Sequence, residues 1–227
     1  MIIPGFLSCK KELTTDSTSP LNKNLEYGTL VDIDNNRYAT IQIGTQNWMA
    51  ENLKTSRYSN GDSLPYILEN WKWYLLDSGA WCYYSHDSSK NALFGKMYNW
   101  YAATDPRNIC PKGWHVPTGH DWLILATNLG GRDIAGSKMK STLKGHWYGG
   151  NAGATNESGF SALPGGKRGI DASFSLLTYR SIFWATDENS DHMDRASSME
   201  LAWNGYGSYE DNGEYKYYGL CIRCVED

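Results

Sequence analysis

Only two segments of this chain carry the apolar periodicity of a helix, which leaves most of its 227 residues to strands and loops. In residues 93–103, apolar side chains recur at 93, 94, 97, 98, 101 and 102, and the pattern stops at Asp105. The second segment begins at Thr118, a good helix cap, places apolar residues at 122, 125, 126 and 129, and ends at Gly130. We therefore expect two helices.

Short alternating runs between turn residues predict strands in the rest of the chain. Residues 29–34 and 38–44 flank Asn35 and Asn36 and read as a β-hairpin. The second half is rich in Gly, Asn, Ser and aromatic residues, and its strand candidates are Phe174–Leu177, Ser181–Ala185, Ser198–Trp203 and Tyr217–Val225. The pattern predicts an α+β fold with two helices, short antiparallel strands and a long loop-rich second half.

Charge and hydropathy argue against two kinds of partner. The chain has 21 Lys and Arg against 25 Asp and Glu, a formal net charge of −4, and no basic run. It therefore lacks the electrostatic footprint of a nucleic-acid-binding protein, and we expect no nucleic-acid partner. No stretch approaches the roughly 20 consecutive apolar residues that a membrane-spanning helix needs.

The first residues, MIIPGFLSC, resemble the end of a bacterial lipoprotein signal, in which Cys9 would be acylated. Residues 10–26 are polar and typical of a flexible tether, so we expect a signal at 1–9, a tether at 10–26 and a folded domain at 27–227. The alternative is a disordered terminus in which Cys9 is an ordinary thiol. In the first case, contact with the membrane runs only through the lipid anchor.

Six motifs, in order along the chain, closely resemble the Fibrobacter succinogenes major paralogous domain family. They are WMAENLK (48–54), LFGKMYNWYAA (93–103), CPKGWHVPTGHDW (110–122), NESGFSALPGGKR (156–168), FWATDE (183–188) and LCIRCVED (220–227). The resemblance implies a C-type lectin-like fold in a secreted or lipid-anchored protein of the bacterial cell envelope, most simply an outer-membrane lipoprotein. The order of motifs is also similar, more distantly, to the formylglycine-generating enzymes.

Cysteine usage then bears on the fold. If Cys9 is lipidated, Cys82, Cys110, Cys221 and Cys224 remain, and four cysteines allow three pairings. Residues three apart on a strand point to opposite faces, which argues against a bond or a shared metal at Cys221 and Cys224. The resemblance implies a bond between Cys110 and Cys224 and leaves Cys82 with Cys221. The alternative is five reduced cysteines.

No motif predicts a catalytic, metal or cofactor site. The spacing of Cys82 and His86 lacks the second local pair that structural zinc usually has, and the calcium motifs of carbohydrate-binding C-type lectins are absent. The acidic residues of the loop at 187–194 are better explained as a solvated surface, and GGKR at 165–168 does not have the spacing of a phosphate-binding loop. We expect CPKGWHVPTGHDW to be a structural joint.

The aromatic residues supply the binding hypothesis. Ten Trp and sixteen Tyr against five Phe favour rings that carry a polar group and suit half-buried surfaces. Sugar rings pack on such side chains while short polar residues bind their hydroxyls. Eight aromatic residues are candidates, and we expect more than half of them to be core: Trp71, Trp73, Tyr74, Trp81, Trp147, Tyr148, Trp203 and Tyr206. The ligand-binding candidates are Trp147, Tyr148, Trp203, Asn204 and Tyr206.

Three hypotheses follow from these observations. The first is a non-enzymatic binding module in the cell envelope, which recognises a glycan or a surface protein through aromatic-rich loops. The second is an enzyme related to the formylglycine-generating oxidoreductases, which would need two reduced thiols open to solvent. The third is an inert structural domain of a surface assembly.

Overall fold

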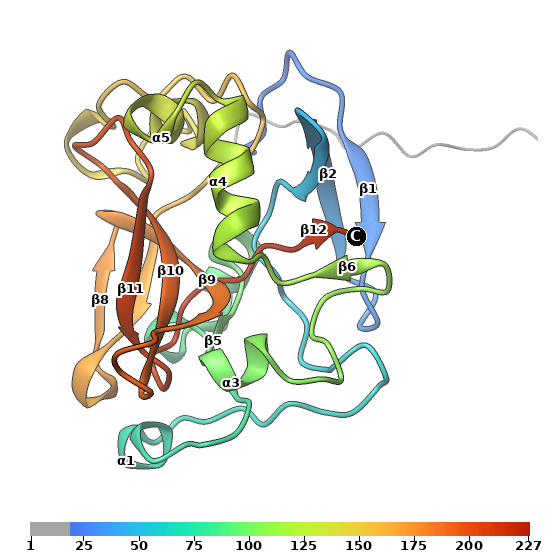
Figure 1. Cartoon of the computed structure of the whole chain (residues 1–227), viewed down its shortest axis with the longest axis vertical. Helices are drawn as coiled ribbons and strands as arrows, with labels where there is room; N and C mark the ends of the chain where they lie inside the picture. The colour runs from blue at the N-terminus through green and yellow to red at the C-terminus, as the bar shows by residue number, and fades with distance from the viewer. Residues whose placement is uncertain (1–18) are drawn as a thin grey trace, which may run out of the picture.

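The first and last strands of the described residues, β1 and β12, belong to the same antiparallel sheet (Figure 1). The computed structural model describes residues 19–227. The order of strands in this sheet is β1, β2, β3, β12 and β6, with bounds Gly28–Val31, Arg37–Ile43, Gln46–Met49, Val225–Glu226 and Trp114–His115. The expected hairpin is confirmed, because β1 and β2 pair around the turn at Asn35 and Asn36.

Three smaller sheets form the other side of the fold. The longest strands belong to the sheet β11-β10-β9, with bounds Tyr209–Tyr215, Arg195–Ala202 and Arg180–Glu188. Two-stranded sheets are formed by β4 (Trp81–Cys82) with β5 (Met97–Tyr98) and by β7 (Gly165–Arg168) with β8 (Phe174–Leu177). The strands expected around residues 174–177, 181–185 and 198–203 are thereby confirmed as β8, β9 and β10.

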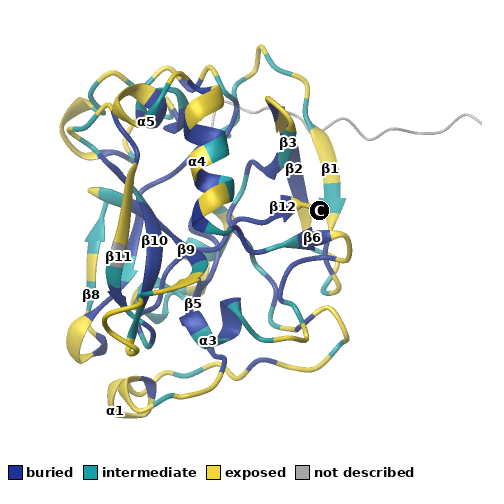
Figure 2. Ribbon diagram, viewed as in Figure 1, coloured by how far each residue is buried: buried dark blue, intermediate teal, exposed yellow. Residues whose placement is uncertain are grey.

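The helices are short, and α4 lies between the sheet that contains β2 and the sheet that contains β10 (Figure 1). Their bounds are α1 Asn70–Tyr74, α2 Asn91–Phe94, α3 Trp100–Ala103, α4 Gly119–Asn128 and α5 Arg132–Met139, with single 3₁₀ turns at η1 Tyr84–His86, η2 Ser88–Lys90, η3 Tyr148–Gly150 and η4 Ile170–Ala172. Helix α4 is the one expected after Thr118, whose side chain accepts from Asp121 N–H while Asp121 accepts from Thr118 N–H. Figure 2 shows that one face of α4 is buried and the other is exposed.

The helix expected over residues 93–103 is wrong. Two short helices, α2 and α3, flank the strand β5 there, and all residues from 94 to 100 are buried rather than one face of a helix. Gly95 ends α2 with φ 68° and ψ −159°, and a side chain at this position would meet Leu53 O. Asn99 then starts α3 by accepting from Ala102 N–H. Full burial of strand β5 produced an apolar pattern that one face of a helix also fits.

Helix α5 is one of the elements that the sequence pattern missed. It buries only Ala135, Gly136 and Met139, and therefore shows no clear apolar stripe. Gly136 lies in its middle because the carbonyl of Gly207 approaches there too closely for any side chain. The turn before β11 is thereby packed directly against α5.

The strand expected over Tyr217–Val225 is also wrong, since only Val225–Glu226 is a strand (β12). The preceding residues make isolated bridges to three different elements: Gly219 to Arg168, Leu220 to Tyr98 and Cys221 to Phe183. Met49 N–H then donates to Cys224 O at 3.0 Å. This segment joins the sheets to one another instead of extending one of them.

The two larger of three clusters of buried apolar residues meet at the C-terminal segment, so that Cys221 belongs to one and Cys224 to the other. In the cluster with Cys221, the fully buried guanidinium of Arg223 lies 4.2 Å from the ring centre of Phe160 and donates to the carbonyls of Phe160 and Ser161. Burial lowers the pKa of Arg223 to about 9. Arg223 therefore supplies hydrogen-bond donors to the carbonyls of Phe160 and Ser161, which lie in a loop and not in a strand.

Residues 20–27 pack onto the second half of the chain. Leu21 and Leu25 contact the cluster that contains Cys221, and Ser141 Oγ donates to Pro20 O at 2.8 Å. This part of the predicted tether therefore belongs to the folded domain. Within residues 19–227, no helix is long and apolar enough to cross a membrane.

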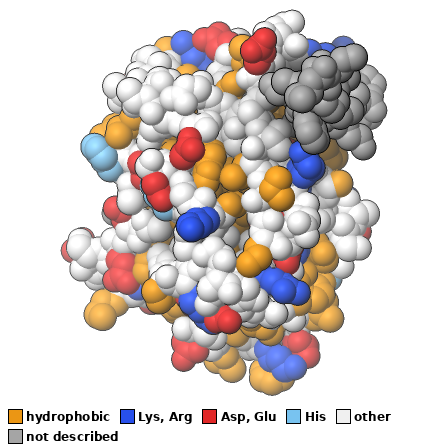
Figure 3. Space-filling model, turned by 90° about the vertical axis from the view of Figure 1, so that its right-hand side faces the viewer, with side chains coloured by type: hydrophobic (Ala, Val, Ile, Leu, Met, Phe, Trp, Pro, Cys, Tyr) orange, Lys and Arg blue, Asp and Glu red, His pale blue; other side chains and the backbone are white. Residues whose placement is uncertain are grey.

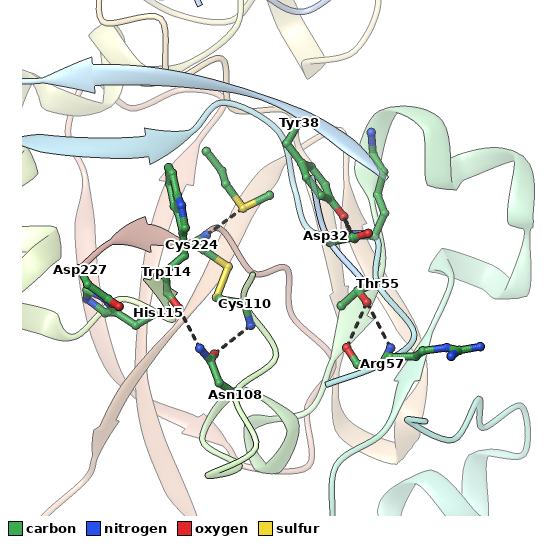
Figure 4. The surroundings of a disulfide bond; sticks show 12 residues. Asp32, Tyr38, Thr55, Arg57, Asn108, Cys110, Trp114, His115, Cys224 and Asp227 are labelled. Atoms are coloured by element: carbon green, nitrogen blue, oxygen red, sulfur yellow. Dashed lines mark hydrogen bonds and ion pairs between the residues drawn. A yellow bond between two sulfur atoms is a disulfide. The ribbon is translucent and has the colours of Figure 1, made fainter. Parts of the chain in front are cut away.

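The stretch CPKGWHVPTGHDW forms a joint around a disulfide (Figure 4). Cys110 is bonded to Cys224, 114 positions later, which confirms the bond that the resemblance implied. Asn108 accepts from Cys110 N–H and donates to Trp114 O, and Trp114 N–H donates to Pro111 O. The joint fixes the start of α4 to the last residues of the chain.

Candidate functional site

Four aromatic side chains from three separate segments form the candidate site, called here the aromatic surface: Tyr148, Tyr179, Trp203 and Tyr206. Tyr148 and Tyr179 are stacked with ring centres 4.6 Å apart, and Trp203 stands edge-on to Tyr148 at 5.1 Å. Tyr148 is 50% exposed and Tyr206 57%, while Trp203 is half-buried. The rings come from η3, from the turn between β8 and β9, and from the turn between β10 and β11.

Backbone hydrogen bonds tie these segments together. Tyr148 N–H donates to Thr178 O at 2.8 Å, and Trp203 N–H donates to Tyr179 O at 2.9 Å. Thr178 has φ 70°, a conformation that costs a β-branched residue free energy and occurs where the surrounding structure enforces it. This turn is therefore held in shape by its neighbours, and the rings are positioned before any ligand binds.

Lys140, at the end of α5, holds the loops of the aromatic surface together and is called here the buried clamp. Its ammonium group donates to the carbonyls of Ala152 (3.0 Å), Ala202 (3.1 Å) and Gly205 (2.7 Å), and its side chain is fully buried. Burial lowers the pKa of Lys140 to about 8. An ammonium group has three donors, so all three are used to join the loop that carries Trp203 and Tyr206 to the loop at 149–153.

Two glycines allow the rings to approach the loop at 149–153. A Cβ atom at Gly149 would overlap the ring of Trp203, and one at Gly153 would overlap the ring of Tyr206. Both glycines also have positive φ, 61° and 65°, which side chains disfavour. The loop is thus shaped to support the undersides of these two rings.

The structure separates two of the predicted ligand-binding residues that are neighbours in the sequence. Trp147 is only 6% exposed, and its indole N–H donates to Ala162 O at 3.3 Å, so it is a core residue. Tyr148 contacts Trp203, Tyr206 packs beside the same loop at Gly153, and Asn204 is exposed in the turn that carries Trp203 and Tyr206. Tyr179 was missed because nothing in the sequence indicates that its turn packs beside Tyr148.

The other aromatic candidates lie elsewhere. Trp73 and Trp81 are buried, and Trp71 (65% exposed) and Tyr74 lie on the outside of α1. The expectation that more than half of the eight would be core is wrong, because three are: Trp73, Trp81 and Trp147. A fold with many loops and little regular structure leaves large rings at the surface.

A hollow of about 470 Å³, separate from the aromatic surface, opens between α3, β6 and β9. Its lining includes Trp100, Thr104, Asp105, His115, Thr186 and Glu188. Its charges are already paired within the chain. Arg107 holds Asp105 at 2.7 Å and lowers the pKa of that carboxyl to about 2, and Lys216 lies 3.0 Å from Glu188. His115 contacts carboxylates through both ring nitrogens. We therefore rank this hollow below the aromatic surface.

Within the described part of the chain, no group of three or more His, Cys, Asp or Glu residues is arranged to hold a metal ion. In the acidic loop expected to be solvated, Asp187 accepts from Gly119 N–H at the start of α4. Glu188 forms the ion pair with Lys216 described above. These carboxylates have partners within the fold.

The expected bond between Cys82 and Cys221 is wrong, since both are free thiols in the structure. Cys82 is 0% and Cys221 1% exposed, and they belong to different buried clusters, with Cys221 Sγ directed at Phe94 O. Burial raises the pKa of each thiol to about 12. Cys9 lies outside the described residues.

We expect both thiols to resist alkylation in the native protein. At pH 8 a thiol with a pKa of about 12 is ionised roughly 10³-fold less than an ordinary one, and burial excludes the reagent as well. Iodoacetamide labelling mapped by mass spectrometry should modify Cys82 and Cys221 only after denaturation. Rapid labelling of either residue in the folded protein would contradict this prediction.

Comparison with known proteins gives one match. The family model described as the Fibrobacter succinogenes major domain matches residues 41–226, which is most of the chain. No curated protein and no solved structure matches.

Proposed function

Because this chain belongs to the Fibrobacter succinogenes major domain family, whose model spans the aromatic surface and its supports, we propose that it is a non-enzymatic binding module for a glycan. The observation that carries this proposal is the aromatic surface. Three separate loops present its rings to solvent, and buried groups hold those loops in place. Such preorganisation lowers the entropic cost of binding.

The chemistry of the surface favours carbohydrate among small ligands. Tyr and Trp faces pack against the C–H groups of a sugar, and tyrosine hydroxyls and the exposed amide of Asn204 can exchange hydrogen bonds with its hydroxyls. Arg180, which follows Tyr179 in the sequence, is paired with Glu200. A neutral, aromatic, polar surface suits a neutral glycan better than a charged ligand. The alternative ligand is a surface protein.

We also propose that the fold is C-type lectin-like and that the protein is anchored in the cell envelope through Cys9. Three features support the fold assignment: the pairing of β3 with β12, the disulfide from the segment before β6 to the residue before β12, and the loop-rich second half. The disulfide suits an oxidising compartment outside the cytoplasm. The expected partner is a glycan or protein of a cell surface, with membrane contact through the lipid anchor only.

The enzyme alternative receives less support. An oxidoreductase related to the formylglycine-generating enzymes would use two thiols open to solvent, whereas Cys110 and Cys224 are bonded and Cys82 and Cys221 are buried. The third hypothesis, an inert structural domain, does not account for the buried clamp under an exposed aromatic surface. The hypothesis of an inert structural domain would be favoured if no ligand binds.

The test is binding to a glycan array and to soluble cell-surface polysaccharides. We expect selective binding that Tyr148→Ala weakens about tenfold, which corresponds to about 1.4 kcal/mol for one lost ring contact. Trp203→Ala should weaken binding at least as much, because Trp203 also supports Tyr148. Dissociation constants of the best glycan, measured by calorimetry, check both variants.

Trp71→Ala is the matched control, because it removes an exposed ring from α1, outside the aromatic surface. It should leave the affinity unchanged. Each variant's melting temperature shows whether it is folded. Equal losses for Trp71→Ala and Tyr148→Ala would contradict the assignment of the site, and binding only to surface proteins would favour the alternative ligand.

A further inference from the structure

The outer edge of β1 is a second feature that a ligand could use. β1 is the end strand of the five-stranded sheet, and Figure 1 places it on the opposite side of the fold from β8, β10 and β11. An exposed edge strand presents unpaired backbone groups, which a further strand can pair with. Natural proteins usually cover or charge such edges, so an open one needs an explanation.

The register identifies which backbone groups are unpaired. Thr29 lies opposite Ala39, and Ala39 directs its N–H to Glu51 and its C=O to Ala50, away from β1. In an antiparallel ladder, bonded and non-bonded pairs alternate, so Thr29 and Val31 point their N–H and C=O groups outward. Within residues 19–227, no strand pairs with this edge. An added strand forms its backbone hydrogen bonds with every second residue of its neighbour, and Thr29 and Val31 have this spacing.

A half-enclosed hollow of about 230 Å³ lies beside this edge, with apolar lining from Val31, Ile33, Ile109, Cys110 and Pro111. Val31 and Ile33 are each 44% exposed. Figure 3 faces this side of the molecule and shows hydrophobic side chains gathered near its middle, with Lys and Arg side chains beside them. The hollow can take an apolar side chain of a strand that pairs with β1.

The charges around the hollow indicate the character of the occupant. Asp32 accepts from Tyr38 OH (Figure 4) and from Asn36, and Arg57 is paired with Asp34 at 3.2 Å. Lys112 lines the hollow and Arg37 lies opposite Val31 in the register, and both are exposed. Neither has an ion-pair partner among the described residues, so the rim carries two free positive charges.

We propose that the edge of β1 and its hollow bind an extended peptide segment of a partner protein, in which an apolar and an acidic residue are two positions apart, so that both side chains lie on the face of the added strand that meets Val31, Arg37 and Lys112. The peptide's backbone pairs with Thr29 and Val31, an apolar side chain fills the hollow, and carboxylates contact Arg37 and Lys112. Main-chain pairing supplies affinity and the hollow supplies selectivity in this mode of recognition. The proposal is independent of the aromatic surface and of its ligand.

The experiment is a fluorescence anisotropy titration of the full chain with a labelled glutamate–valine peptide, in which valine and glutamate occupy every second position in turn and serine fills the positions between them. We expect saturable binding that is lost when alternate peptide nitrogens are methylated, because methylation removes the donors that pair with β1. Arg37→Glu combined with Lys112→Glu should weaken binding at least about tenfold. Lys144→Glu, a reversal at an exposed lysine outside this surface, should not.

Three outcomes would overturn the proposal. The first is no saturable binding of the glutamate–valine peptide. The second is equal binding of a lysine–valine peptide or of the methylated peptide. The third is a dimer, detected by sedimentation, that Thr29→Pro dissociates, since proline removes one outward N–H of this edge and the occupant would then be a second copy of this chain.

Discussion

Replacing Cys110 and Cys224 together by serine is expected to lower the free energy of unfolding by about 4 kcal/mol. The bond closes a loop of more than a hundred residues, because the two cysteines are 114 positions apart, and loops of that length restrict the unfolded chain strongly. For a domain of this size, the melting temperature should fall by about 10 °C. Urea unfolding of the native and variant proteins measures the difference directly.

The control uses reductant on both proteins. Reductant should lower the melting temperature of the native protein toward that of the double variant and leave the double variant unchanged, because Cys82 and Cys221 form no bond. A further loss of stability in the reduced double variant would indicate a second disulfide. A native protein that is insensitive to reductant after unfolding and refolding would contradict the prediction.

Lys140→Met is expected to cost about 3 kcal/mol of stability and to loosen the aromatic surface. Methionine fills the same volume but donates nothing, so the carbonyls of Ala152, Ala202 and Gly205 lose their donor in a buried place. Urea unfolding gives the change in stability. Hydrogen exchange should quicken selectively in residues 151–153 and 202–206, and glycan affinity should fall with it.

Lys138→Met is the matched control, two residues earlier on α5. Lys138 is paired at 3.0 Å with Glu157, which is largely exposed, and such a surface pair contributes at most about 1 kcal/mol. Exchange in the two loops should stay as in the native protein. If both variants lose equal stability, or if Lys140→Met leaves the loops protected, then Lys140 is not the clamp described here.

Local chemistry explains which elements could be predicted. Thr118 and Asp121 cap α4 through bonds within one turn, and Asn35 and Asn36 form the hairpin turn between adjacent strands. These interactions involve residues close in the sequence, so their pattern is visible there. The segment at 93–103 could not be read in the same way, because burial on all sides erases the periodicity that distinguishes a strand from a helix.

The candidate site shows the same limit. Trp147 and Tyr148 are neighbours of similar chemistry, and only the tertiary structure determines that the first meets Ala162 O in the core while the second stacks on Tyr179 at the surface. The predicted residues Trp203, Asn204 and Tyr206 are near Tyr148 because Lys140 joins their loops. A buried lysine gives no signal in the sequence, where its type indicates exposure.

By itself the sequence determined the α+β class, the capped helix, the hairpin and three of the strands, since each depends on interactions over a few residues. The resemblance of its motifs also pointed to the family and to the bond between Cys110 and Cys224. Only the tertiary structure decided which aromatic rings are exposed, which cysteines remain free and which strand edge is open. Those outcomes depend on contacts between segments that are far apart in the sequence, some by more than a hundred residues. Propensity and periodicity do not report such contacts.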